Sequence, residues 1–240
     1  MKLALIGYGK MGKIIEQIAI SRGHTIAGKS SSKEPIETVD FSKVDVAIEF
    51  TTPSFAVRHI EHCLDNNTPI VVGTTAWNEQ LPYVKTLVEQ KEGTLLHASN
   101  FSIGVNVFFD INKRLAKLMA NHSDYKPSLE ETHHVHKLDA PSGTAVTIAN
   151  DIMLENDKLE SWKLGEEKAP EVKPWQLPVT SYRKPEVPGT HLVTYESPID
   201  TIQISHTAHS REGFALGAVI AAEFIQEKKG IFTMQDVIKF

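Results

Sequence analysis

The stretch ETHHVHKLDAPSGTA (131–145) combines side chains that move protons with residues that begin a helix. Its three histidines and Lys137 can donate or accept a proton, the imidazoles near neutral pH. A Pro-Ser step then precedes Gly143 and Thr144, whose N–H groups would open the helix. Free N–H groups at a helix N-terminus bind anions such as carboxylates. The stretch therefore predicts acid–base chemistry on an anionic substrate.

The spacing of the histidines suggests which of them act together. If residues 131–137 form a strand, His133 and Lys137 point to the same face as an acid–base pair. His134 and His136 then point to the opposite face. Two other interpretations stay open, namely surface histidines beside a capped helix and a zinc site. The stretch has no nearby cysteine and neither H-x₃-H nor H-E-x-x-H spacing, so we predict no metal.

A second motif, GYGKMG (7–12), follows the apolar run KLALIG and opens a segment with helical periodicity. Gly7, Gly9 and Gly12 fit the G-x-G-x-x-G pattern, in which the glycines allow a tight turn, an approaching pyrophosphate and close helix packing. The N-terminus of the helix would stabilise the phosphates. An ordinary strand-to-helix turn could carry the same glycines, but the flanking elements favour dinucleotide binding.

The end of the next expected strand bears on the choice of dinucleotide. NAD-binding folds place Asp or Glu about 20 residues after the glycine turn, where it accepts from the ribose 2′-OH. Here the sequence is GKSSS (28–32), and Lys29 with its flanking serines would attract a 2′-phosphate. We therefore expect NADPH as the cofactor, with NADH as the alternative. A solvated loop lysine is the other interpretation of Lys29.

These motifs lie in an alternation of short apolar runs and helical patterns, which predicts a parallel sheet covered on both faces. Besides the N-terminal run, strands are expected at 24–28, 45–50, 69–73 and 94–99. The pattern changes from Phe101. Helices are expected there at 105–122, 144–156 and 211–230, with extended segments at 128–137, 190–197 and 200–210. We interpret the proline-rich stretch 157–190 as a long surface excursion.

We predict an α/β protein of two domains. Residues 1–102 and 211–240 form a Rossmann-type dinucleotide-binding domain, and residues 103–210 form an α+β substrate-binding domain. The net charge of −5 and the lack of a basic tract argue against a nucleic-acid partner. No window approaches the ~20 apolar residues of a membrane span. Cys63 is the single cysteine, which fits a reducing compartment, so we expect a soluble, cytoplasmic protein.

The pattern E-x-H-H-x-x-K-x-D-A-P-S-G-T-A resembles the signature of the dihydrodipicolinate reductase (4-hydroxy-tetrahydrodipicolinate reductase) family of lysine and diaminopimelate biosynthesis. Four further blocks resemble the family in the same order. They are LIGYGKMG, VVGTTAW (71–77), SNFSIGVNVF (99–108) and IQISHTAHSREGFALGAV (202–219). The resemblance covers nearly the whole chain, although PGTHLVTYES (188–197) matches only loosely and is assigned no role.

The resemblance implies roles for individual residues. His133 would be the acid/base group, Lys137 the proton donor and His134 a substrate contact. The helix start would hold a substrate carboxylate through Ser142, Gly143 and Thr144. Besides Lys29, the implied cofactor contacts are Gly7, Tyr8, Gly9, Lys10, Met11, Gly12, Gly73, Thr74, Thr75, Ser99, Asn100, Phe101 and Ser102.

The resemblance also implies the reaction and the assembly. The reaction is reduction of a cyclic imine dicarboxylate by hydride transfer from NAD(P)H, with a positioned acid protonating the adjacent carbon. The second domain would carry an open mixed sheet that pairs subunits into a homotetramer, and the two domains would close during the reaction. Two alternatives stay open. One is another small imino-acid or amino-acid dehydrogenase, and the other is a non-catalytic NAD(P)-sensing Rossmann protein.

Overall fold

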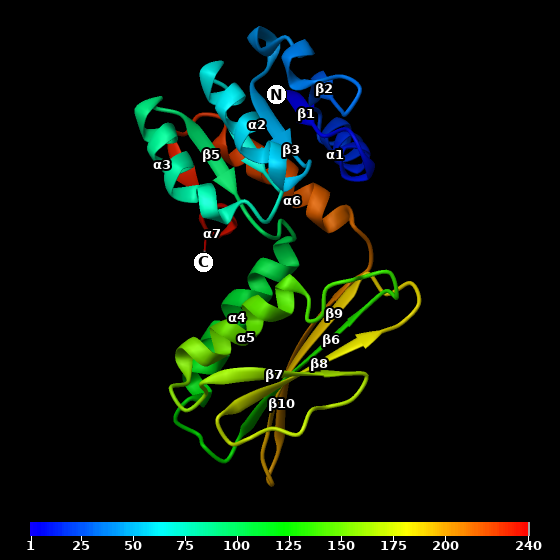
Figure 1. Ribbon diagram of the computed structural model, residues 1–240, viewed down its shortest axis with the longest axis vertical. Helices are drawn as coiled ribbons and strands as arrows, with labels where there is room; N and C mark the ends of the chain where they lie inside the picture. The colour runs from blue at the N-terminus through cyan, green and yellow to red at the C-terminus, as the bar shows by residue number, and fades with distance from the viewer. Residues whose placement is uncertain (240) are drawn as a thin grey trace. The chain divides into compact units, whose positions relative to one another are not determined.

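The computed structural model describes residues 1–239, so residue 240, the last of the predicted first domain, lies outside the described residues. The chain forms two compact units (Figure 1). The first consists of Met1–Ile103 and the chain from Glu212 onward, and the second of Gly104–Arg211. Among residues 1–239, none of the helices combines the length and apolar character needed to cross a bilayer.

The first unit is built on a parallel sheet of six strands in the order β11-β5-β4-β3-β1-β2. The strands are β1 (Lys2–Ile6), β2 (Thr25–Ser30), β3 (Val46–Glu49), β4 (Ile70–Val72), β5 (Thr94–His97) and β11 (Gly230–Phe232). Five of them are the expected apolar runs, and β11 was not predicted. The strand order reverses beside β1, and such a switch point opens a crevice at the carboxyl ends of the strands.

Helices cover both faces of this sheet, as the alternating pattern predicted (Figure 1). They are α1 (Lys10–Ser21), α2 (Pro53–Asp65), α3 (Leu81–Gln90), α6 (Glu212–Ile225) and the short α7 (Met234–Val237). Leu3 and Leu5 of β1 face the core under α1 and α6, whereas Ala4 and Ile6 face the core under α2 and α3. Cys63 is fully buried in this second core.

The second unit carries a mixed sheet in the order β10-β9-β6-β8-β7. Its elements are α4 (Ile103–Met119), β6 (Lys126–His133), α5 (Gly143–Glu155), β7 (Ser161–Glu166), β8 (Gln176–Arg183), β9 (Gly189–Glu196) and β10 (Thr201–Ala208). Strands β6, β7 and β8 run parallel, and β9 is antiparallel to both β6 and β10. Helices α4 and α5 lie on one face of this sheet, over a core that includes Leu129, Val179 and Val193 (Figure 1).

The structure corrects two expectations in this unit. The stretch 157–190 is not a surface excursion, because it supplies β7 and β8, and Leu177 and Val179 of β8 are fully buried. Four of the five prolines in this stretch lie outside the two strands, so its high proline content suggested a loop where strands are present. The expected strand over 131–137 is confirmed for residues 131–133 and wrong beyond them, because β6 ends at His133 and a turn follows it.

Candidate active site

The predicted histidine cluster begins at the carboxyl end of β6, on the face of the sheet that the helices cover. Alternation along β6 places Glu131 and His133 on the same face as the core residue Leu129. In register, Glu131 lies opposite His191 of β9, and His133 lies opposite Arg183 of β8. The sheet therefore gathers four ionisable side chains from three strands, β6, β8 and β9.

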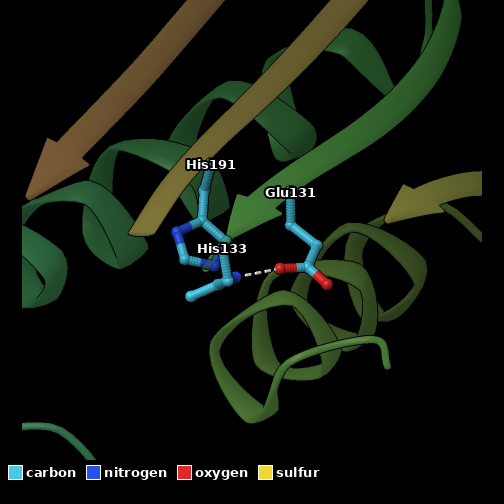
Figure 2. Close-up of side chains that lie close together, drawn as sticks. All are labelled: Glu131, His133 and His191. Carbon is cyan, nitrogen blue, oxygen red and sulfur yellow. Dashed lines mark hydrogen bonds and ion pairs between the residues drawn. The ribbon is translucent and has the colours of Figure 1, made fainter. Parts of the chain in front are cut away.

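Glu131 and His133 form a buried pair (Figure 2). Glu131 is fully buried, and one of its carboxylate oxygens accepts a hydrogen bond from Nδ1 of His133. Its other oxygen accepts from Nη1 of Arg183 at 3.0 Å. Burial disfavours the ionised carboxyl, but the contacts with His133, Ser181 and Arg183 outweigh this effect and lower the pKa of Glu131 to about 2. Glu131 is therefore a carboxylate at neutral pH.

His191 contacts both this pair and the N-terminus of helix α5. Its ring lies 5.2 Å from that of His133, in an edge-to-face arrangement, and its Nε2 lies 3.1 Å from Oγ of Ser142. Burial and the neighbouring His133 lower the pKa of His191 to about 3, so this imidazole is neutral at neutral pH. We had not assigned His191 a role. The alternation of buried His191, Val193 and Tyr195 along β9 is a signal that points it inward.

The predicted anion site lies at the first turn of α5. Oγ of Ser142 accepts from the N–H of Ala145 at 3.1 Å and caps the helix. Gly143 is exposed, and a Cβ placed there would meet nothing within 4 Å. The first turn itself carries no acidic residue, but the Asp139 carboxyl, which precedes the helix, interacts with the backbone N–H of Gly143. The predicted contacts Ser142, Gly143 and Thr144 thus share one helix start.

Lys137 and His134 lie in the turn and loop between β6 and α5. Lys137 Nζ lies 2.8 Å from each carboxylate oxygen of Asp139. Within residues 1–239, no hydrogen bond joins Lys137 to His133, so the expectation that they share a strand face is wrong. His134 is half-buried, and its Nδ1 is buried without a hydrogen-bond partner in the described chain. Burial and the charge of Arg211 lower the pKa of His134.

The same cluster has the donor types of a metal site. One ligand atom each from Glu131, His133 and His191 lies within 4.8 Å of the others. However, the Glu131 carboxylate is already bonded to the Arg183 guanidinium and to Nδ1 of His133. A metal ion at these atoms would displace the imidazole hydrogen and lie close to a permanent positive charge. We therefore assign the cluster to proton chemistry.

Eight of the predicted cofactor residues line two cavities in the first unit that share part of their walls, whereas Gly12, Lys29 and the Ser99–Ser102 block are not among the lining residues. The smaller cavity, of about 350 Å³, brings the glycine turn and the Gly-Thr-Thr loop together. It is lined by Gly7, Gly9, Lys10, Met11, Phe50, Thr51, Pro53, Gly73, Thr74 and Thr75. The larger cavity, of about 440 Å³, extends past Tyr8 to Ser31, Ser32, Glu37 and Arg58. Both cavities lie beyond the carboxyl ends of the parallel strands, where open α/β sheets bind ligands.

The local geometry explains why glycine occupies the turn. Gly7 has φ +96°, and a Cβ there would lie 2.1 Å from the carbonyl oxygen of Phe50. A Cβ at Gly12 would lie 2.7 Å from the carbonyl oxygen of Gly7, so the third glycine allows the helix to pack closely. A Cβ at Gly73 would collide with the ring of Phe50. The missing side chains therefore let the turn, the helix and the Gly-Thr-Thr loop pack closely against Phe50 and against one another.

Lys29 takes part in a different contact from the one expected. Its Nζ lies 2.7 Å from Oε1 of Glu16 and 4.2 Å from the centre of the Tyr8 ring. The bond to Glu16 raises the pKa of Lys29 and lowers that of Glu16. Lys29 is not among the residues that line the larger cavity, although Tyr8 beneath it is. The Tyr8 ring therefore separates the Lys29 ammonium from the cavity, and the Glu16 carboxylate partly neutralises its charge.

Residues Ser99 to Ser102 do not line either of the two cavities, but Phe101 packs against a residue that does. The ring of Phe101 is buried and lies 5.7 Å from that of Phe50, which lines both cavities. Oδ1 of Asn100 accepts from the N–H of Ser102 at 2.9 Å, and Ser99 is exposed. Phe101 therefore supports the position of Phe50.

Comparison with known protein families finds two matches that together cover almost the entire chain. Residues 1–101 match the family model for dihydrodipicolinate reductase, N-terminus, and residues 104–238 match the one for its C-terminus. The chain is 46% identical to a 4-hydroxy-tetrahydrodipicolinate reductase of Christiangramia forsetii, over 99% of this chain and 98% of that protein. It is 33% identical to the enzyme of the same name from Thermosipho africanus, over 100% and 98% of the two chains.

Among solved structures, the fold resembles a dipicolinate-bound dihydrodipicolinate reductase from Paenisporosarcina sp. TG-14. The TM-score is 0.74 at 24% identity, and the likeness covers 97% of each chain. An amine dehydrogenase from Mycobacterium smegmatis shares the fold at a TM-score of 0.63 and 11% identity, over 96% of this chain and 94% of that one.

Proposed function

The chain belongs to the dihydrodipicolinate reductase family, and from this we propose that His133 and the helix start of α5 form its catalytic centre. It is an NAD(P)H-dependent oxidoreductase that reduces 4-hydroxy-tetrahydrodipicolinate to tetrahydrodipicolinate in diaminopimelate and lysine biosynthesis. The observation that carries the assignment of the centre is the buried Glu131–His133 pair, linked through His191 to the Ser142 cap.

We propose that the cofactor binds in the two cavities beside the glycine turn. The backbone of Gly7 and Gly9 and the first turn of α1, which carries no acidic residue, would hold the pyrophosphate. Thr74 and Thr75 would contact the nicotinamide half. When bound, the cofactor supplies the hydride for the reduction. Phe50, held by Phe101, would close the wall of the site.

The substrate's charge and ring suit the second group of residues. One carboxylate of the dicarboxylate would accept hydrogen bonds from the N–H groups of Gly143 and Thr144 and from Ser142. His134, whose Nδ1 lacks a partner, would contact substrate, and the Lys137 ammonium would offset its negative charge. Lys137 now pairs with Asp139, so it would exchange this partner for the substrate.

The proton chemistry falls to His133 and Lys137. The substrate loses its C4 hydroxyl group as water, and hydride adds to C4 of the resulting conjugated imine. Negative charge then develops on the adjacent carbon, and a positioned acid must protonate it. We propose that His133 is this acid/base group and that Lys137 supplies the proton.

Three finer assignments are also proposals. The cofactor would be NADPH in preference to NADH, since the hydroxyl-bearing Ser31 and Ser32 line the far end of the larger cavity and the Lys29 ammonium lies over the ring of Tyr8 in its wall. The protein would be cytoplasmic, which suits its unpaired Cys63. It would be a homotetramer assembled through the second unit, whose edge strand β10 is largely exposed.

The activity is tested by following NADPH consumption with substrate made in situ by the synthase that condenses pyruvate with aspartate semialdehyde. Consumption that requires both this protein and the synthase product supports the reductase, and a parallel series with NADH gives the cofactor preference. Cofactor binding without consumption would instead favour a sensor. Consumption with a different imino or keto acid would favour another small dehydrogenase.

A further inference from the structure

The reaction described above does not use Glu131, although its carboxylate lies at the centre of the buried cluster. We propose that Glu131 is a positioning residue that sets His133 and the Lys137 loop at once, through its two oxygens. One oxygen bonds the His133 ring, and the other bonds Arg183, which in turn bonds the loop. This inference rests on the proposed role of His133 and adds the groups that hold it in place.

The first oxygen determines which nitrogen of His133 remains free for chemistry. An ionised carboxylate only accepts hydrogen bonds, so the Nδ1 that contacts it must carry a hydrogen. Nε2 is then the nitrogen that gains and loses a proton. It lies beside Gly189, where a Cβ would be only 2.9 Å from it, so the missing side chain leaves space at this atom. Glu131 thus presents Nε2 to the reactants.

The second oxygen reaches the loop through a guanidinium. Arg183 donates from Nη2 to the carbonyl of Asp139 at 2.7 Å and from Nε to the carbonyl of Lys137 at 3.4 Å. Its Nη1 bonds Glu131 and also the carbonyl of Tyr182 at 2.8 Å. The planar five-donor fork of arginine can satisfy these acceptors together, whereas an ammonium cannot. The position of the Lys137 backbone is therefore tied to that of the His133 ring.

Burial makes this arrangement rigid. Glu131 is fully buried and its neighbour His133 is nearly so, which excludes water that would compete for the carboxylate. On the other side of His133, the neutral His191 ring fills the space and bonds the Ser142 cap. A positioned acid–base group needs such supporting contacts, because small displacements reduce rates strongly.

The decisive variant is Glu131→Gln, compared with Glu130→Gln on the same strand. Glu130 is exposed and faces the opposite side of the sheet, so it controls for the loss of a carboxylate from β6. We expect Glu131→Gln to lower kcat by about 10²- to 10³-fold and to change the KM for substrate and the Kd for NADPH less than threefold. Glu130→Gln should match the wild type. Turnover of Glu131→Gln within threefold of the wild type would overturn the proposal.

A measurement on the unmodified protein keeps the proposal testable if Glu131→Gln does not fold. Nitrogen-15 NMR of labelled histidine, assigned with His133→Gln, reports which ring nitrogen carries hydrogen. We expect Nδ1 of His133 to stay protonated as the pH rises, while Nε2 loses its hydrogen. Loss of hydrogen from Nδ1 first would rule out the role of Glu131, even in an active enzyme. If the wild-type protein were inactive, the proposed function would be refuted. The protonation pattern of His133 would still be measured, because the NMR experiment does not require activity.

Arg183→Lys tests the link to the loop separately. An ammonium can still pair with Glu131, but it cannot also bond the carbonyls of Lys137 and Asp139. Because the loop carries substrate contacts, we expect a KM for substrate raised about tenfold, with the protonation pattern of His133 unchanged. A KM unchanged from the wild type would show that Arg183 does not position the loop.

Discussion

At the scale of single residues, the proposed site is built from three pairs of side chains that contact each other. His133 is hydrogen-bonded to Glu131, Ser142 to His191, and Lys137 to Asp139. The first two pairs hold the proposed acid/base group and a proposed substrate contact in place. The third is an exposed ion pair, which stabilises by about 1 kcal/mol or less and separates readily. The resting site therefore has a fixed histidine and a lysine that is free to change partners.

His133→Ala should lower kcat by roughly 10²- to 10⁴-fold, because the acid/base group is removed. The proposed cofactor contacts belong to the other unit, so the Kd for NADPH, measured by fluorescence titration, should stay near the wild-type value. His136→Ala is the matched control, since His136 is exposed in the same stretch. Equal turnover in the two variants would remove His133 from the mechanism.

Lys29→Met should weaken NADPH binding by about tenfold and leave NADH binding near the wild-type value, because a cation near the 2′-phosphate is lost. The matched control is Lys43→Met, whose ammonium pairs with Asp40 on the surface. The ratio of the two Kd values is the readout. If this ratio does not change, the bond of Lys29 to Glu16 is its whole role, and the selectivity lies with other residues of the cavity.

The sequence predicts roles for His133 and Ser142 but not for the residues that contact them. Glu131 precedes His133 by two positions on the same strand, so alternation alone points both to one face. Arg183 and His191 could not be found in this way, because their proximity depends on the registers of β8 and β9. Register is set by long-range packing, and β8 was hidden in a stretch read as a loop.

At the scale of elements, β9 supports the site through its backbone as well as its histidine. Gly189 begins this strand against the His133 ring. Gly189→Ala should displace the ring and lower kcat by about ten- to a hundredfold. Thr190→Ala, at the next position, should remain near the wild type. Steady-state kinetics with both variants checks this, and an unchanged kcat for Gly189→Ala would mean that the ring moves without consequence.

His191 should make the folded state sensitive to mild acid. The folded state binds the His191 proton only near pH 3, whereas the unfolded state binds it near pH 6.5. Between these values unfolding takes up a proton, so a lower pH favours it. The contribution is complete above pH 6.5, and it falls by up to about 1.4 kcal/mol per pH unit below that value.

Urea unfolding at pH 7, 6 and 5 measures this slope. His191→Gln removes the titrating group and should flatten the dependence between pH 6.5 and 4.5. Below that window the Glu131 carboxyl, whose pKa is lowered to about 2, adds a loss in the same direction. His136→Gln, on the surface, should keep the wild-type slope. Parallel curves for His191→Gln and the wild type would show that His191 titrates normally.

At the scale of the whole molecule, the sequence predicted two units, and its periodicity was clearest in the first. Short buried strands separated by amphipathic helices make a strong local signal, so β11 is the only described strand of the first unit that the sequence does not predict. The second unit pairs strands distant in the sequence, and local pattern contains little of that information. Strand β7 reaches its neighbour β8 across the proline-rich segment, for example.

The proposed tetramer gives a test on the intact chain. Light scattering after gel filtration should give about four times the 26.7 kDa of one chain. Leu192 lies on the sheet face away from α4 and α5, opposite Glu130, which can pair with a new guanidinium. Leu192→Arg should therefore lower the mass without unfolding the chain. Leu118→Arg, at an exposed leucine of α4, should not, and a tetrameric Leu192→Arg would exclude this face.

The buried thiol of Cys63 gives the molecule a chemical reporter of its own opening. Burial raises the pKa of this thiol, so it is neither exposed nor ionised in the folded state. Because the sequence has no other cysteine, any reaction with a maleimide records exposure of the core under α2 and α3. The second unit contains no thiol and stays silent. Labelling kinetics therefore follow the opening of one unit alone in the unmodified protein.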